Sequence, residues 1–187
     1  MRNITTTYGL PQLTLPLQAR CRPSIIAKCF TLALGSAFVS VSATISLVRS
    51  ISGYAWYYAG GLVSHMSKKQ PMVALSSTEA EYIALTNVIQ EGLWLHFLLA
   101  ELNIPFTSPV FVYLDNSGAI TLLTTAKFHQ HTKHIDIQYH FIHFHINNGS
   151  FLLIWVSSHC NIADILTKAL PYPAFETLCF SIGLVPQ

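Results

Sequence analysis

The spacing of apolar residues predicts regular secondary structure most clearly from residue 53 onward. Aromatic residues at 54–58 lead into Gly60-Gly61 and a second short run, which is the pattern of a β-hairpin that turns at the two glycines. An apolar stripe of helical period then predicts one long helix over about Ser77–Leu102, and Pro105 prevents it from running further.

The rest of the chain carries shorter elements. We expect a strand at 110–115 (VFVYLD), a helix at 116–125, a polar helix at about 131–147, a strand at 151–157 (FLLIWVS), a helix at 161–170 (NIADILTKAL) and a weak helix near 173–183. Asn147-Asn148-Gly149 ends the polar helix. This order of elements is typical of a mixed α/β domain.

The first fifty residues do not share this pattern. Residues 1–23 show no period and indicate a loop, whereas 29–48 are twenty uncharged residues, about the length of a membrane span. Six of these are Ser or Thr, and the second half alternates apolar and hydroxyl residues as a half-buried strand does. We expect a strand or an ill-ordered segment at 38–48, with a membrane span as the alternative. The first fifty residues as a whole are also acid-free and bear arginines, as transit peptides do.

Charge divides the chain into a basic and an acidic part. No Asp or Glu precedes Glu79, and all eight acids of the chain follow from there, together with only three lysines and no arginine. Because affinity for nucleic acids comes largely from Lys and Arg on phosphates, this part should bind them weakly near neutral pH.

Three carboxylates occupy comparable places in the predicted elements. Glu81 lies in the first turn of the long helix, Asp115 at the end of a strand, and Asp164 on the helix after the last strand. Carboxylates gathered at strand ends and helix starts can hold Mg²⁺, and paired ions can promote phosphodiester cleavage. The alternative is that each acid caps a helix or is solvated.

Two acids stand close together at the start of the long helix. Both Ser76-x-x-Glu79 and Thr78-x-x-Glu81 fit the capping box, in which a Glu satisfies backbone donors. Residues two apart point in different directions on a helix, so one Glu can cap while the other faces a metal site.

Six motifs from Ser52 to Leu170 follow one another in the order of a known family. They are SGYAWYYAGG (52–61), SKKQPMVALSSTEAEYIAL (67–85), LWLHFLLAEL (93–102), VYLDNSGAI (112–120), TKHIDIQYHFI (132–142) and ADILTKALP (163–171). With them the chain resembles the ribonuclease H domain at the end of copia-type retrotransposon polyproteins. The resemblance implies a ribonuclease H-like α/β fold: a five-stranded mixed sheet flanked by helices.

The resemblance also implies a chemistry and its residues. The family cuts the RNA strand of an RNA–DNA hybrid with two Mg²⁺ ions, beside a reverse transcriptase domain. Its acidic ligands match Glu81, Asp115 and Asp164, which leaves the capping role to Glu79. A histidine that assists product release in cellular relatives matches His159.

One part of the family pattern is absent. The family's first strand ends in an Asp, about fifteen residues before SGY, where this chain has VSVSATISLVRS. The first strand is therefore missing or replaced, and a central strand covered on both faces should be more uniformly apolar than this one. Without the bridging Asp, three carboxylates leave a site for one Mg²⁺, and we expect weak or no cleavage. An Asp placed within 39–45 should restore part of it.

These observations predict three regions. They are a non-homologous N-terminal segment (1–50), a truncated ribonuclease H-like domain (51–170) and a C-terminal tail with a weak helix (171–187). Two alternatives stay open: a non-catalytic module that binds nucleic acid or a reverse transcriptase, and a fragment addressed to an organelle or a membrane by its first fifty residues. The expected location is intracellular, with cytoplasm or nucleus favoured over an organelle and a membrane disfavoured.

Overall fold

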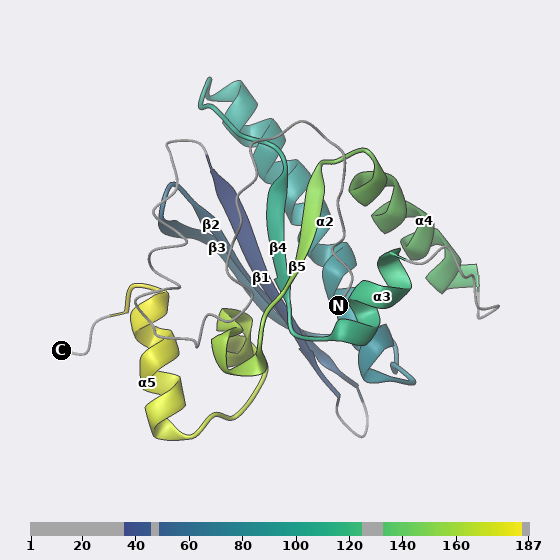
Figure 1. Cartoon of the computed structure of the whole chain (residues 1–187), viewed down its shortest axis with the longest axis vertical. Coiled ribbons are helices and arrows are strands. Elements are labelled where there is room, and N and C mark those ends of the chain that lie inside the picture. Colours follow the sequence, from purple (N-terminus) through teal and green to yellow (C-terminus); the bar gives the residue numbers. More distant parts are fainter. Residues whose placement is uncertain (1–35, 46–48, 125–132, 185–187) are drawn as a thin grey trace, which may run out of the picture.

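One mixed sheet of five strands forms the centre of the computed structural model, which describes residues 36–45, 49–124 and 133–184 (Figure 1). The strands are β1 (Ala37–Thr44), β2 (Ile51–Tyr58), β3 (Gly61–Lys69), β4 (Val110–Leu114) and β5 (Phe151–Trp155), and their order across the sheet is β3-β2-β1-β4-β5. The pairs β1–β2 and β2–β3 are antiparallel, whereas β1–β4 and β4–β5 are parallel. The expected five-stranded mixed sheet is confirmed.

Helices cover both faces of this sheet. They are α2 (Ser77–Glu101), α3 (Ser117–Thr124), α4 (Lys133–Asn147) and α5 (Tyr172–Ser181), with two short 3₁₀ helices, η1 (Ser158–Cys160) and η2 (Ile162–Leu166). The long helix α2 lies behind the sheet in Figure 1 and packs against β1, β2 and α4, while η2 and α5 lie on the opposite face. The sequence predicted α2, α3, α4 and α5 to within a few residues.

Strand β1 takes the place of the family's first strand, which the sequence predicted to be missing or replaced. Val39 and Val41 are fully buried against α2, whereas Ser40 and Ser42 point to the opposite face, toward η2. The alternation of valine and serine therefore suits a central strand, because η2 supplies hydrogen-bond partners for the buried hydroxyls. Our expectation that such a strand should be uniformly apolar was wrong for this reason.

The position of β1 also decides between the alternatives for 29–48. Ala37–Thr44 is a sheet strand, so the strand interpretation is confirmed there and the membrane span is excluded for these residues; positions 29–35 and 46–48 lie outside the described residues. Among the described helices, α2 is long and apolar enough to cross a membrane, but its buried side forms the core of the domain. The folded unit thus includes part of the segment 1–50.

Two local predictions need correction. The hairpin turns at Ala59-Gly60 rather than Gly60-Gly61, and both residues have positive φ (49° and 84°), as a type I′ turn requires. Within 161–170 the chain forms only the short 3₁₀ helix η2 (Ile162–Leu166) instead of an α-helix, with i to i+3 hydrogen bonds such as Thr167 N to Asp164 O. Gly53 on β2 lets η2 approach, because a Cβ there would lie 2.6 Å from Thr167 Cγ2.

Candidate active site

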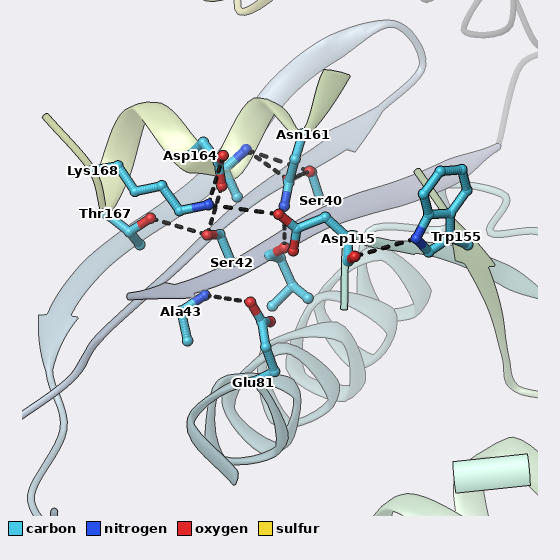
Figure 2. Close-up of polar contacts among 12 residues, drawn as sticks. Ser40, Ser42, Ala43, Glu81, Asp115, Trp155, Asn161, Asp164, Thr167 and Lys168 are labelled. Carbon is cyan, nitrogen blue, oxygen red and sulfur yellow. Dashed lines mark hydrogen bonds and ion pairs between the residues drawn. The ribbon is translucent and has the colours of Figure 1, made fainter. Parts of the chain in front are cut away.

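The start of α2 separates the roles of its two acids. Ser76 is the N-cap, and its hydroxyl accepts a hydrogen bond from Glu79 N (3.1 Å), while Glu79 Oε2 accepts one from Leu75 N (2.7 Å). Glu79 therefore satisfies backbone donors at the helix start, as the sequence predicted. Glu81 points away from this cap and toward the end of β1, where its Oε1 accepts a hydrogen bond from Ala43 N (2.8 Å; Figure 2).

Asp115 and Asp164 meet at one ammonium group. Asp115 follows the last residue of β4, and Asp164 lies within η2. Lys168 Nζ lies 2.8 Å from Asp164 Oδ2 and 3.5 Å from Asp115 Oδ2 (Figure 2). The two aspartates and Glu81 thus gather at the same end of β1 and β4, as the sequence predicted.

Ser42 is the contribution of β1 to this cluster. Its hydroxyl donates a hydrogen bond to Asp164 Oδ1 (2.7 Å) and also contacts Thr167 Oγ1 (3.0 Å). Ser40 and Tyr113 are the last residues paired in the parallel register of β1 and β4, and Ser42 and Asp115 each follow two residues further on. Ser42 is fully buried.

Asn161 fixes η2 against β1. Its Nδ2 donates to Val41 O (2.9 Å), and its Oδ1 accepts from Ser40 Oγ (2.5 Å) and from Ala163 N (3.2 Å). The oxygen and the nitrogen of this buried amide both have hydrogen-bond partners, so Asn161 ties the start of η2 to β1. Asp164 and Lys168 are placed by this attachment.

Burial controls the electrostatics of the cluster. The pKa of Glu81 is raised to about 8, mainly by removal from water and also by the charges of Asp115 and Asp164. The hydrogen bond from Ala43 N and the charge of Lys168 oppose this rise only in part. Burial disfavours the charged form of Lys168, but its contacts with Asp164 and Asp115 outweigh this and raise its pKa. At neutral pH Glu81 is thus mainly protonated, and Asp115 and Asp164 share one ammonium.

The cluster does not fit a divalent metal as it is arranged here. Its oxygens are of the type that Mg²⁺ prefers, and Glu81 Oε2 is buried without a hydrogen-bond partner. However, Lys168 lies between the two aspartates, and no group of three or more His, Cys, Asp or Glu side chains among the described residues is arranged to hold a metal ion. The metal-ligand role of Glu81, Asp115 and Asp164 stays a prediction.

His159 lies apart from the three carboxylates. It belongs to η1, its side chain is exposed, and it makes no hydrogen bond or ion pair with them in the described structure. Trp155 at the end of β5 instead contacts this edge, because its Nε1 donates to Asp115 O (3.2 Å). The role of His159 in product release therefore stays a prediction.

The sequence of the chain is similar to those of known proteins. The chain is 42% identical over 135 residues to the retrovirus-related Pol polyprotein from transposon RE1 of Arabidopsis thaliana, and 43% identical over 136 residues to that from transposon TNT 1-94 of Nicotiana tabacum. These matches cover 72% and 73% of this chain but only 9% and 10% of the relatives. The chain therefore spans about a tenth of the length of the curated relatives it matches.

The fold has relatives among solved structures. LC11-RNase H1 superposes with a TM-score of 0.54 at 12% identity, over 72% of this chain and 94% of that one, and its structure in complex with an RNA/DNA hybrid gives 0.53, also at 12% identity, over 71% and 94%. At this identity the likeness shows the fold alone. The homologues are copia-type retrotransposon Pol polyproteins, and the fold is that of ribonuclease H. No protein-family model matches the chain.

A further relative is shorter. The secreted RxLR effector protein 161 of Plasmopara viticola is 60% identical over 47 residues, which are 25% of this chain and 33% of the effector.

Sequence reasoning missed three polar residues of this ribonuclease H fold: Ser42, Asn161 and Lys168. Ser42 falls inside the interval 39–45 in which an Asp was expected to restore cleavage, but no pattern singles it out. The spacing of Asp164 and Lys168, four residues apart, was the one signal for an ion pair.

Proposed function

We propose that this chain derives from a retrotransposon ribonuclease H, that its partner is an RNA–DNA hybrid, and that it cleaves the RNA strand weakly or not at all. The fold, the Pol polyprotein homologues and the gathering of Glu81, Asp115 and Asp164 at one edge of the sheet support the origin. The RNA/DNA hybrid bound by a protein of the same fold supports the choice of partner.

The hydroxyl of Ser42 carries the argument for impaired cleavage. The resemblance expects a carboxylate at the end of the first strand, and Ser42 is the residue of β1 that contacts Asp164, the aspartate that shares Lys168 with Asp115. A serine supplies one neutral oxygen where an aspartate supplies two anionic ones. Its hydroxyl is moreover engaged by Asp164 and Thr167, so it does not face a substrate.

The other acids do not compensate for this loss. Lys168 neutralises part of the charge of Asp115 and Asp164, and burial keeps Glu81 mainly protonated at neutral pH. Glu81 is therefore mainly neutral, and Asp115 and Asp164 are each paired with Lys168. A general base needs a free, ionised acceptor within hydrogen-bond reach of the attacking water, and the cluster offers none.

Cleavage of a labelled RNA–DNA hybrid in the presence of Mg²⁺ tests the proposal. We expect negligible turnover by the native chain and partial recovery in Ser42→Asp, because only the latter adds a carboxylate beside Asp115 and Asp164. Ser40→Asp is the matched control, since Ser40 lies on the same face of β1 but contacts Asn161 instead. The double variant Ser42→Asp/Asp115→Asn should lose the recovered activity.

Two results would contradict this proposal. Robust turnover by the native chain, abolished by Asp115→Asn, would show that another group replaces the missing carboxylate. Equal recovery in Ser40→Asp and Ser42→Asp would show that position 42 has no special role.

Binding of nucleic acid without cleavage is the second candidate. One observation favours it. Although β1 carries Ser42 where the family has a carboxylate, Asn161 and η2 still pack on this face of β1, so the fold around Ser42 is formed. Fluorescence anisotropy of the labelled hybrid distinguishes this candidate, since a binding module would saturate with hybrid and leave it uncut. Because Lys and Arg are few, binding should be detectable only at low salt.

A further inference from the structure

Lys168 bridges two carboxylates from different elements of the fold. Its Nζ contacts Asp164 Oδ2 in η2 and Asp115 Oδ2 after β4, and these are its two ion pairs in the described structure. The two aspartates are almost buried, with side-chain exposures of 4% for Asp164 and 10% for Asp115. A cation placed between two such carboxylates occupies the position that a bridging metal ion would need.

The surrounding groups are built for a cation at this place. Ser42 Oγ donates to the second oxygen of Asp164, so this carboxylate is oriented by β1 on one side and by Lys168 on the other (Figure 2). Glu81, only 3% exposed, leaves its Oε2 buried and without a partner at the same end of β1. Buried oxygens of this kind are unfavourable unless a donor or a cation satisfies them.

We infer that the Lys168 ammonium is the internal counterion of this cluster and excludes divalent cations from it, and that loss of this ammonium turns the cluster into a site for a hard divalent cation such as Mg²⁺. This inference rests on the contacts of Lys168 and not on the proposed function. It is consistent with weak or absent Mg²⁺-dependent cleavage by the native chain, and its test uses no hybrid, so the inference and the proposed function can fail separately.

Competition between the two cations follows from their chemistry. Mg²⁺ gives up its waters reluctantly and demands oxygen ligands in octahedral geometry. In the native chain it would also have to displace an ammonium that is already hydrogen-bonded at 2.8 Å. In Lys168→Met the side chain keeps about the same length but carries no charge, so the two carboxylates lose the cation they share and favour a dication between them.

Thermal unfolding of the full chain, without nucleic acid and at increasing Mg²⁺, tests this inference. The native midpoint should not depend on Mg²⁺. Lys168→Met should unfold at a lower temperature, and saturating Mg²⁺ should raise its midpoint by about 3 °C or more, as binding to the folded state alone requires. Lys168→Arg should behave like the native chain, because it keeps the charge.

Two controls make the result specific to this cluster. Lys68→Met removes an exposed lysine from β3 and should change neither the midpoint nor its independence of Mg²⁺. Lys168→Met/Asp115→Asn should lose the response to Mg²⁺, because only one of the two bridged carboxylates remains.

Each outcome of the thermal unfolding experiment either supports or overturns the inference. A Lys168→Met chain that folds only with Mg²⁺ would support the inference as strongly as a shifted midpoint. The inference is overturned if Mg²⁺ stabilises the native chain to the same extent as the variant. It is also overturned if Lys168→Met gains nothing from Mg²⁺, whether that variant is folded or unfolded.

Discussion

Replacement of Glu81 by glutamine should change how the stability of the domain depends on pH. Glu81 is 3% exposed, and burial raises its pKa from 4.5 to about 8. Glutamine has the shape of the protonated acid and keeps an oxygen that can accept the hydrogen bond from Ala43 N, but it cannot ionise. The comparison of Glu81→Gln with the native chain therefore isolates the titration of this single carboxyl.

The sign and the size of the effect follow from linkage. Between pH 4.5 and about 8 the folded state holds the proton of Glu81 while the unfolded chain has lost it, so the free energy of unfolding falls as pH rises. Each unit of difference in pKa corresponds to about 1.4 kcal/mol. The native chain thus has its full stability from this group below pH 4.5 and loses up to about 5 kcal/mol of it once pH exceeds 8.

Urea unfolding at pH 5.5, 7.0 and 8.5 measures this loss. Relative to the native chain, Glu81→Gln should become more stable by about 3 kcal/mol between pH 5.5 and 8.5. His143 and His145, whose pKa values are lowered mainly by burial, weaken the fold as pH falls below their usual range. They are present in both proteins and cancel in the difference. A difference between the two proteins that stays constant with pH would refute the reasoning, because Glu81 would then titrate alike in the folded and unfolded chains.

Two further predictions concern α2. Glu79→Ala should lower the free energy of unfolding by about 1 kcal/mol, because Leu75 N loses its acceptor; Glu79→Gln should cost clearly less, and equal losses in the two variants by urea unfolding would exclude the capping role. Gly92→Ala should destabilise by about 1–3 kcal/mol despite the better helix propensity of alanine, since its Cβ would lie 2.6 Å from Trp56 Cζ2 and 3.0 Å from Phe151 Cε1. A stabilised Gly92→Ala would show that Trp56 can move aside.

Local sequence determined the elements of this protein because their signals are local. The capping box of Ser76 and Glu79, the apolar stripe of α2 and the positive φ that Gly60 permits in the hairpin each depend on residues a few positions apart. The alternation of Val39, Ser40, Val41 and Ser42 likewise indicated a strand with two unlike faces. Such patterns identify an element but do not say what each of its faces will meet.

The partners of β1 were decided by tertiary structure alone. A buried serine is satisfied or costly depending on which groups face it, and those groups come from η2, more than a hundred residues later in the chain. The same packing made Ile162–Leu166 a short 3₁₀ helix where an α-helix was expected over 161–170, because the contacts of Asn161, Asp164 and Thr167 with β1 hold that segment close to the sheet.

The three carboxylates show the same division between what the sequence predicts and what the tertiary structure decides. The motifs located Glu81, Asp115 and Asp164 in the sequence, but their charges depend on burial and on the position of Lys168, and neither is encoded in the spacing of the acids. Desolvation and ion pairing are properties of the assembled site, since they sum over groups brought together from α2, β1, β4 and η2. The sequence by itself therefore determined which acids this protein has at the edge of its sheet, and only the folded structure decided which of them stay charged and what neutralises them.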